Sequence, residues 1–122
     1  VARWQRIARE AAQQCGRSAV PEIAAPRELS GWPRPASGEE GLLLCLWEEE
    51  RRGLHSCLPS GLCPRATVVV GPEGGLAPDE VRALVEAGAL VAGLGPRLLR
   101  TETAGAVAVA LLQSRYGDLG RG

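Results

Sequence analysis

The chain has 122 residues, a length that fits a single domain. Its 14 basic residues, all arginines, are matched by 14 acidic residues, so the formal net charge is zero. This composition excludes a strongly basic nucleic-acid binder. The apolar runs are much shorter than the ~20 residues that a membrane-spanning helix needs. We therefore expect a globular domain with no membrane partner.

The first segment, residues 2–15, has apolar residues at helical spacing. One face of this predicted helix carries Trp4, Ile7, Ala8, Ala11 and Cys15, and the opposite face carries Arg6, Arg9 and Gln13. Gly16 is a natural stop for the helix. Residues 17–41 are rich in Pro, Gly and Ser, which predicts a loop with at most one helical turn near Leu29.

The middle of the chain predicts a buried strand followed by an irregular connection. Residues 41–47 form a continuous apolar run, which is typical of a strand buried on both faces of a parallel sheet. Three glutamates, 48–50, mark its carboxyl end. Residues 51–65 contain two glycines and two prolines and are expected to be irregular.

The remaining elements alternate between strand and helix. Residues 66–70 predict a strand, and Pro78 starts a helix whose Val81, Leu84 and Val85 are expected to face a core before Gly88 ends it. Residues 90–94 predict a further strand, and residues 101 to about 113 predict a helix. This last helix is apolar or small all round, so we expect it to be buried on several sides and to form a homodimer contact.

This alternation predicts an α/β fold with parallel strands. Two glycine-bearing loops follow predicted strands: Val-Val-Gly-Pro-Glu-Gly-Gly-Leu at 69–76 and Leu-Gly-Pro-Arg-Leu-Leu-Arg-Thr-Glu-Thr-Ala at 94–104. Glycines let backbone N–H groups approach a ligand, and ligands of open α/β sheets bind at the carboxyl ends of the strands. The two loops therefore predict a small-molecule site built mainly from backbone.

The four cysteines have no CxxC spacing, and we expect a reduced, cytoplasmic protein. Cys15 and Cys45 are interpreted as small core residues. His55, Cys57 and Cys63 lack a fourth partner and fit no usual zinc spacing, so no metal is expected.

Together, the two glycine-bearing loops resemble those of the SPOUT methyltransferases, and in particular the RsmE family, which methylates N3 of a uridine in small-subunit ribosomal RNA. The opening Arg-Trp-Gln-Arg-Ile-Ala and the Gln-Gln-Cys-Gly-Arg-Ser at 13–18 are similar to the same family. The resemblance extends from Trp4 to about Gln113, with Leu98 where Ile is usual.

The resemblance implies a parallel sheet with a deep C-terminal trefoil knot, in which about Leu94 to Leu112 is the threaded piece. It implies that residues 1–122 are a partial SPOUT domain. The PUA-like RNA-binding barrel and the first strand and helix of the domain are expected to be absent from this chain. It also implies a homodimer that acts on ribosomal RNA of the small subunit.

The resemblance further implies that three loops bind S-adenosylmethionine: Trp47–Glu50, Gly71–Leu76 and Leu94–Thr103. The cofactor-binding candidates are Trp47, Gly71, Pro72, Gly74, Leu94, Gly95, Leu99, Thr101 and Thr103. For the glycines, a tight turn followed by a helix start is the competing interpretation. For Leu94 and Leu99 the competing interpretation is a core position.

Uracil N3–H is weakly acidic, so methylation there needs help with proton removal. Glu73 is the candidate base, and Arg97 and Arg100 are candidates to stabilise charge on the uracil oxygens. Arg100 is equally interpretable as half of a structural ion pair with Glu73 or Glu102. Arg17 and Ser18 are candidates for holding an RNA phosphate, or belong to a helix-end surface.

Three functions remain open at this point. The first is an rRNA uridine-N3 methyltransferase, or another SPOUT RNA methyltransferase. The second is a non-catalytic dimerisation and RNA-docking module. The third is an unrelated α/β nucleotide binder that uses the 71–75 loop as an anion nest, although the chain has no GK[ST] sequence typical of a P-loop.

Overall fold

The computed structural model describes residues 1–32, 41–94 and 100–120. The chain divides into two compact units, Val1–Pro33 and Arg34–Gly122, which are described separately.

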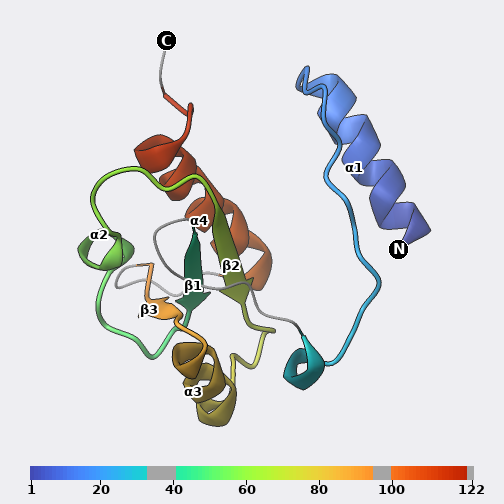
Figure 1. Ribbon diagram of the computed structural model, residues 1–122. Coiled ribbons are helices and arrows are strands. Elements are labelled where there is room, and N and C mark those ends of the chain that lie inside the picture. Colours follow the sequence, from blue (N-terminus) through green and yellow to red (C-terminus); the bar gives the residue numbers. More distant parts are fainter. Residues whose placement is uncertain (33–40, 95–99, 121–122) are drawn as a thin grey trace. The chain divides into compact units, whose positions relative to one another are not determined.

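The first unit consists of helix α1, Ala2–Gln14, and an extended segment that returns along it (Figure 1). The helix ends in a Schellman motif, in which the Gly16 N–H donates to the carbonyl of Gln13 and the Arg17 N–H to that of Ala12. The Gln5 side chain fixes the returning segment. Its amide nitrogen donates to the Pro21 carbonyl, and its amide oxygen accepts the N–H of Ile23, both at 2.8 Å.

The predicted helix is confirmed, but its buried face differs from the expected one. Ala12 is the buried residue of α1, whereas Trp4 is 57% exposed and Ile7 48% exposed. Cys15 is also exposed, so its interpretation as a core residue is wrong. The helix contacts the returning segment through the polar Gln5, a contact that apolar periodicity does not reveal. The helical turn expected near Leu29 is present as a 3-10 turn, Leu29–Gly31.

The second unit is built on a three-stranded parallel sheet in the order β2-β1-β3 (Figure 1). The strands are β1, Leu42–Leu46, β2, Ala66–Val70, and β3, Leu90–Ala92. In the central register Leu44 of β1 lies opposite Val68 of β2 and Leu90 of β3. The prediction of an α/β fold with parallel strands is therefore confirmed, although β3 ends two residues earlier than expected.

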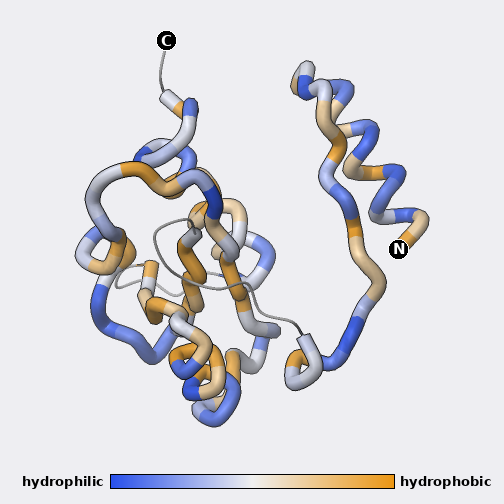
Figure 2. Tube along the Cα trace, viewed as in Figure 1, coloured by the Kyte–Doolittle hydropathy of each residue, from blue (hydrophilic) through white to orange (hydrophobic). Residues whose placement is uncertain are grey.

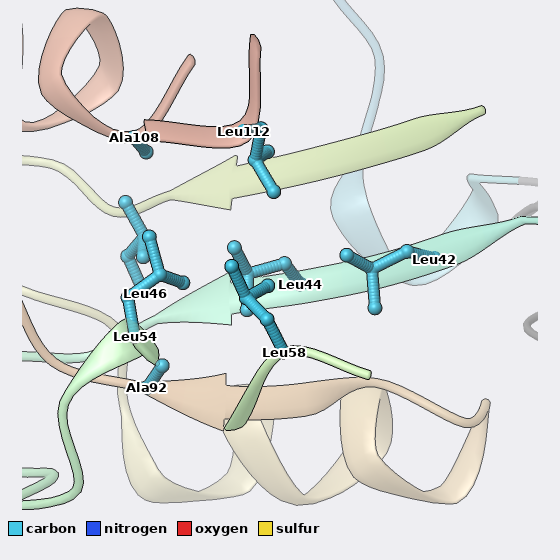
Figure 3. Close-up of a cluster of buried hydrophobic side chains, with 8 residues drawn as sticks. All are labelled: Leu42, Leu44, Leu46, Leu54, Leu58, Ala92, Ala108 and Leu112. Atoms are coloured by element: carbon cyan, nitrogen blue, oxygen red, sulfur yellow. The ribbon is translucent and has the colours of Figure 1, made fainter. Parts of the chain in front are cut away.

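Every residue of β1 is buried, as its continuous apolar sequence predicts. Leu42, Leu44 and Leu46 share one face of the strand because side chains alternate along it. On that face they join a core cluster with residues of two helices and β3 (Figure 3): Leu54, Leu58, Ala92, Ala108 and Leu112. Leu43 and Cys45, which alternate with them, are also fully buried. Hydrophobic colouring in Figure 2 accordingly follows the strands.

Helix α3, Pro78–Glu86, begins and ends as predicted. Pro78 occupies its first turn, and the Glu80 carboxylate accepts the N–H of Ala77 at 2.9 Å. Gly88, with φ of +101°, ends the helix in a second Schellman motif. Val81 and Leu84 are buried, but Val85 is 48% exposed and the expectation that it faces the core is wrong. Val85 is turned about 100° from the fully buried Leu84 and lies at the edge of the buried stripe, beyond Val81.

Helix α2, Leu54–Cys57, lies within the segment expected to be irregular. Its single turn is held by tertiary contacts. The Leu54 N–H donates to the Gly93 carbonyl at 3.0 Å, and Leu54 and Leu58 are both buried in the core cluster. A four-residue helix has no apolar period that a sequence could show.

Helix α4, Thr101–Tyr116, extends three residues beyond its predicted end. Ala108 and Leu112 are buried in the core cluster, but Val109 is 51% exposed and Ala110 is exposed too. Within this chain the helix is therefore buried along one side only. Among the described residues no helix is both long enough and apolar enough to cross a membrane.

Candidate functional site

A cleft in the second unit lies at the carboxyl ends of all three strands. It encloses about 620 Å³ of empty space, part of it open to solvent. Its lining comes from the ends of the strands, the loops that follow them and the start of α4: Leu46, Trp47, Glu48, Glu50, Val70, Gly71, Pro72, Gly75, Leu76, Ala92, Gly93, Leu94, Thr101 and Ala104. The predicted location of the site, beyond the strand ends, is the location of this cleft.

The loop after β2 is a tight turn that closes back on the cleft. The Gly75 N–H donates to the Pro72 carbonyl at 2.8 Å. A Cβ added at Gly71 would lie 2.9 Å from both the backbone nitrogen and the Cγ of Leu76, so this position has room only for glycine. The Trp47 indole N–H donates to the Leu76 carbonyl at 3.2 Å and thereby ties the end of β1 to this loop.

The glycines of the loop differ in what surrounds them. Gly75 lines the cleft and has a φ of +80°, a conformation that favours glycine. A Cβ built there would lie 3.1 Å from the Glu48 carboxylate. Gly74 lies outside the cleft lining, and a Cβ there would meet nothing within 4 Å.

The third wall of the cleft is formed by β3, the residues after it and α4. Gly93, Leu94, Thr101 and Ala104 line this wall. A Cβ at Gly93 would lie 2.5 Å from the Glu50 carbonyl oxygen, because the loop after β1 crosses directly over this glycine. The Gly93 N–H also donates to the Arg52 carbonyl at 2.8 Å.

The structure thus brings five predicted cofactor-binding residues together around one cleft: Trp47, Gly71, Pro72, Leu94 and Thr101. Gly74 and Thr103 are described but do not line it. Gly95, Arg97 and Leu99 lie outside the described residues.

The other charged candidates are solvent-exposed. Glu73 is exposed on the 71–76 loop, next to the cleft-lining Pro72. The Arg100 guanidinium lies 4.0 Å from the Glu102 carboxylate, and the two side chains are 87% and 68% exposed. Of the two candidate ion-pair partners, Glu73 and Glu102, the structure thus pairs Arg100 with Glu102. Arg17 and Ser18 are exposed after α1, in the first unit.

Sequence reasoning missed Glu48, Glu50, Gly75 and Gly93 as individual lining residues. Both glutamates belong to the loop Trp47–Glu50, which is expected to bind the cofactor. Their position directly after a buried strand is the sequence feature that could have identified them as lining residues. Gly93 carries no comparable signal, since only the crossing of two backbones makes it necessary.

The cleft-lining Glu50 is paired with Arg52, which does not line the cleft. The Arg52 Nε–H donates to the Glu50 carboxylate, and this hydrogen bond raises the pKa of the Arg52 guanidinium further above its ordinary value. Burial in β1 raises the pKa of the Cys45 thiol from 9.0 to about 11, which makes it a poor nucleophile. Among the described residues no cluster of His, Cys, Asp or Glu is arranged to hold a metal ion.

Comparison with known proteins gives a family match over most of the chain. Residues 1–113 match the family model described as an RNA methyltransferase domain. The ribosomal RNA small subunit methyltransferase E of Mycobacterium bovis is 38% identical over 120 residues, which is 93% of this chain and 45% of that protein. Its namesake from Bacillus subtilis is 36% identical over 109 residues, 84% of this chain and 42% of that protein.

Solved structures agree with these matches. A putative methyltransferase from Legionella pneumophila, in complex with the cofactor SAM, has a TM-score of 0.83 and 36% identity. Ribosomal RNA small subunit methyltransferase E from Neisseria gonorrhoeae, bound to S-adenosyl methionine, has a TM-score of 0.81 and 33% identity. Each match covers 97% of this chain but slightly less than half of the other, so the chain spans about half the length of its relatives.

Proposed function

Because the chain belongs to the RNA methyltransferase domain family, we propose that it forms the S-adenosylmethionine-binding part of an enzyme that methylates N3 of a uridine in small-subunit ribosomal RNA. The observation that carries this proposal is the cleft at the three strand ends, with its glycine-bearing loop. The ligand named for the Neisseria gonorrhoeae relative and the names of the curated relatives support it.

The residues around the cleft fit this cofactor. Apolar side chains, among them Leu46, Val70 and Leu76, suit an adenine ring, and the backbone at Gly71 and Gly75 passes close to the cleft. Trp47, Pro72, Leu94 and Thr101 would complete the binding wall, with Gly74, Gly95, Leu99 and Thr103 as further members of the proposed set. The cofactor, when bound, supplies the activated methyl group.

The chain's own residues would position the uridine and manage its proton. Glu73, exposed beside the cleft, is the proposed base for the N3 proton. Arg97 and Arg100 are proposed to stabilise negative charge on the uracil oxygens as that proton leaves. Arg100 is exposed enough to reach an RNA, and its distant pairing with Glu102 costs little to break. Arg17 and Ser18 are proposed to hold an RNA phosphate.

We also propose that the domain carries the trefoil knot typical of SPOUT enzymes and acts in the cytoplasm as a homodimer. The exposed apolar side of α4, which includes Val109 and Ala110, supports a dimer contact. Val109→Arg places a charge on that side without touching the core, so it should convert a dimer to a monomer in light scattering. A wild-type chain that is monomeric at micromolar concentration would contradict the dimer proposal.

Calorimetric titration of this chain with S-adenosylmethionine tests the proposed site. Ala104→Leu adds a side chain to the cleft wall, whereas Ala106→Leu makes the same change on an exposed position of the same helix. We expect saturable one-to-one binding that falls at least about tenfold in Ala104→Leu and stays within about twofold in Ala106→Leu, since a filled cleft loses ligand contacts outright. A folded wild-type chain that does not bind would refute the proposal for this chain.

The reaction itself is tested on small-subunit ribosomal RNA with nucleoside mass spectrometry as the readout. The expected product is 3-methyluridine, and methylation at another atom of the base would refute the proposed position.

A further inference from the structure

The described lining of the cleft has two acidic side chains, and one of them, Glu50, has an ion-pair partner among the described residues. Glu50 accepts the hydrogen bond from Arg52, and its side chain is 22% exposed. Glu48 is exposed and, within the described part of the chain, makes no hydrogen bond or ion pair. At the edge of the site its carboxylate is therefore a negative charge with no partner among the described residues.

The position of Glu48 is fixed by the elements on both sides of it. It follows Trp47, which is itself held to the 71–76 loop through the Leu76 carbonyl. One carboxylate oxygen reaches to within 3.1 Å of the point where a Cβ on Gly75 would lie. The segment that leaves β1 is accordingly hydrophilic, in contrast to the strand before it (Figure 2). Glu48 thus spans the first and second loops of the cleft.

The remaining described lining carries no formal charge apart from Glu48 and Glu50. Apolar contacts respond little to the charge of a bound molecule, because their energies follow the area buried. Backbone groups respond through partial charges, which are smaller than the formal charge of a carboxylate. An unpaired carboxylate responds to charge directly. In this cleft, Glu48 is therefore the described group that can separate two ligands of equal shape and unequal charge.

We propose that Glu48 is a specificity-determining residue that favours cationic S-adenosylmethionine over its neutral product, S-adenosylhomocysteine. This inference rests on the proposed function. The two molecules differ by one methyl group and by the positive charge on sulfur. Methyl transfer to uridine N3 breaks the S–C bond and returns the bonding pair to sulfur, while the N3 proton leaves to a base. The product is a neutral thioether, and attraction to Glu48 is lost when the reaction is complete.

The expected size of the effect follows from the exposure of Glu48. A charge pair near a solvated surface contributes little, so we expect Glu48 to improve the affinity for the cationic ligand by about 3- to 10-fold. The preference should shrink as salt is raised, since the Debye length falls from about 10 Å at 0.1 M to about 3 Å at 1 M.

The test is calorimetric titration of the chain and two variants with S-adenosylmethionine and with S-adenosylhomocysteine. Glu48→Gln removes the charge and keeps the shape. Glu49→Gln is the matched control, because Glu49 is the next residue, is exposed and does not line the cleft. We expect Glu48→Gln to weaken binding of S-adenosylmethionine about 3- to 10-fold and to leave S-adenosylhomocysteine within about twofold. Glu49→Gln should change neither.

Retained binding of S-adenosylhomocysteine shows that the variant is folded and its cleft intact. Equal weakening of both ligands by Glu48→Gln would overturn the inference, because it would place Glu48 against a group that both share, such as the amino group. No change, or an equal effect of Glu49→Gln, would overturn it too. A folded wild-type chain that binds neither ligand would instead refute the proposed function, and the inference with it.

Discussion

Gly93→Ala is expected to be the most damaging single-methyl change near the cleft. The loop that leaves β1 crosses Gly93 so closely that the new Cβ would lie 2.5 Å from the Glu50 carbonyl oxygen and 3.7 Å from that of Arg52. The clash with Glu50 is to a backbone atom, so no side-chain rotation relieves it, whereas the distance to Arg52 is an ordinary contact. The loop must move away from the end of β3.

The cost has two parts. Overpacking a closely fitted site typically costs about 1–3 kcal/mol. Displacement of the loop also strains the hydrogen bond from the Gly93 N–H to the Arg52 carbonyl and the one from the Leu54 N–H to the Gly93 carbonyl, at 2.8 and 3.0 Å. Each is worth about 0.5–1.5 kcal/mol. We expect Gly93→Ala to lower the free energy of unfolding by about 2–6 kcal/mol when both hydrogen bonds are lost.

Urea denaturation followed by circular dichroism measures this effect, and Gly53→Ala is its control. Gly53 forms an isolated bridge with Gly93, yet a Cβ there meets nothing within 4 Å and its φ is −71°. Its replacement should therefore change stability by less than about 1 kcal/mol, in the favourable direction if at all. Equal midpoints for Gly93→Ala and wild type would refute the reasoning, as would equal losses in the two variants.

Three further predictions follow from burial and from single contacts. Leu84→Ala should lower the free energy of unfolding by about 2–5 kcal/mol because Leu84 is fully buried, whereas Val85→Ala should cost less than about 1 kcal/mol; equal losses in urea denaturation would contradict the observed orientation of α3. Trp47→Phe removes the N–H that donates to the Leu76 carbonyl and should weaken S-adenosylmethionine binding about 2- to 10-fold in calorimetry. An unchanged Kd would contradict a role for this hydrogen bond in shaping the cleft. Because the Cys45 thiol has a pKa of about 11 in the fold and about 9.0 unfolded, the unfolded chain loses its proton first, and the free energy of unfolding should fall as pH rises from 9 to 11; this part of the fall should be absent in Cys45→Ala.

The sheet could be predicted because the residues of each strand show, by themselves, a pattern typical of a buried strand. β1 and the Val-rich β2 each have more consecutive apolar residues than a solvent-exposed loop usually has. Both strands lie where they are expected. The two motifs were equally informative about family, and the predicted family was confirmed by the match over residues 1–113. Local pattern was sufficient wherever one element's own residues decided its conformation.

Tertiary contacts decided the elements that the sequence did not predict. Helix α2 exists because Leu54 is buried and its N–H finds a carbonyl on a residue 39 positions away. Helix α1 holds its returning segment through Gln5, a polar residue that periodicity assigns to no core. In each case the deciding partner is distant in sequence, so no window of local pattern contains it.

The glycines of the 71–75 loop show the same limit within a single motif. The sequence predicts Gly71 and Gly74 as cofactor-binding residues and does not single out Gly75. The structure separates them, because a Cβ at Gly71 meets Leu76 at 2.9 Å and Gly75 needs a φ of +80°, whereas Gly74 has free space around it. Loss of binding after substitution of Gly71 or Gly75 would therefore mix a damaged turn with a blocked site. Ala104 avoids that ambiguity, since it lines the cleft from within a helix, where leucine has a good intrinsic propensity and no turn conformation is at stake.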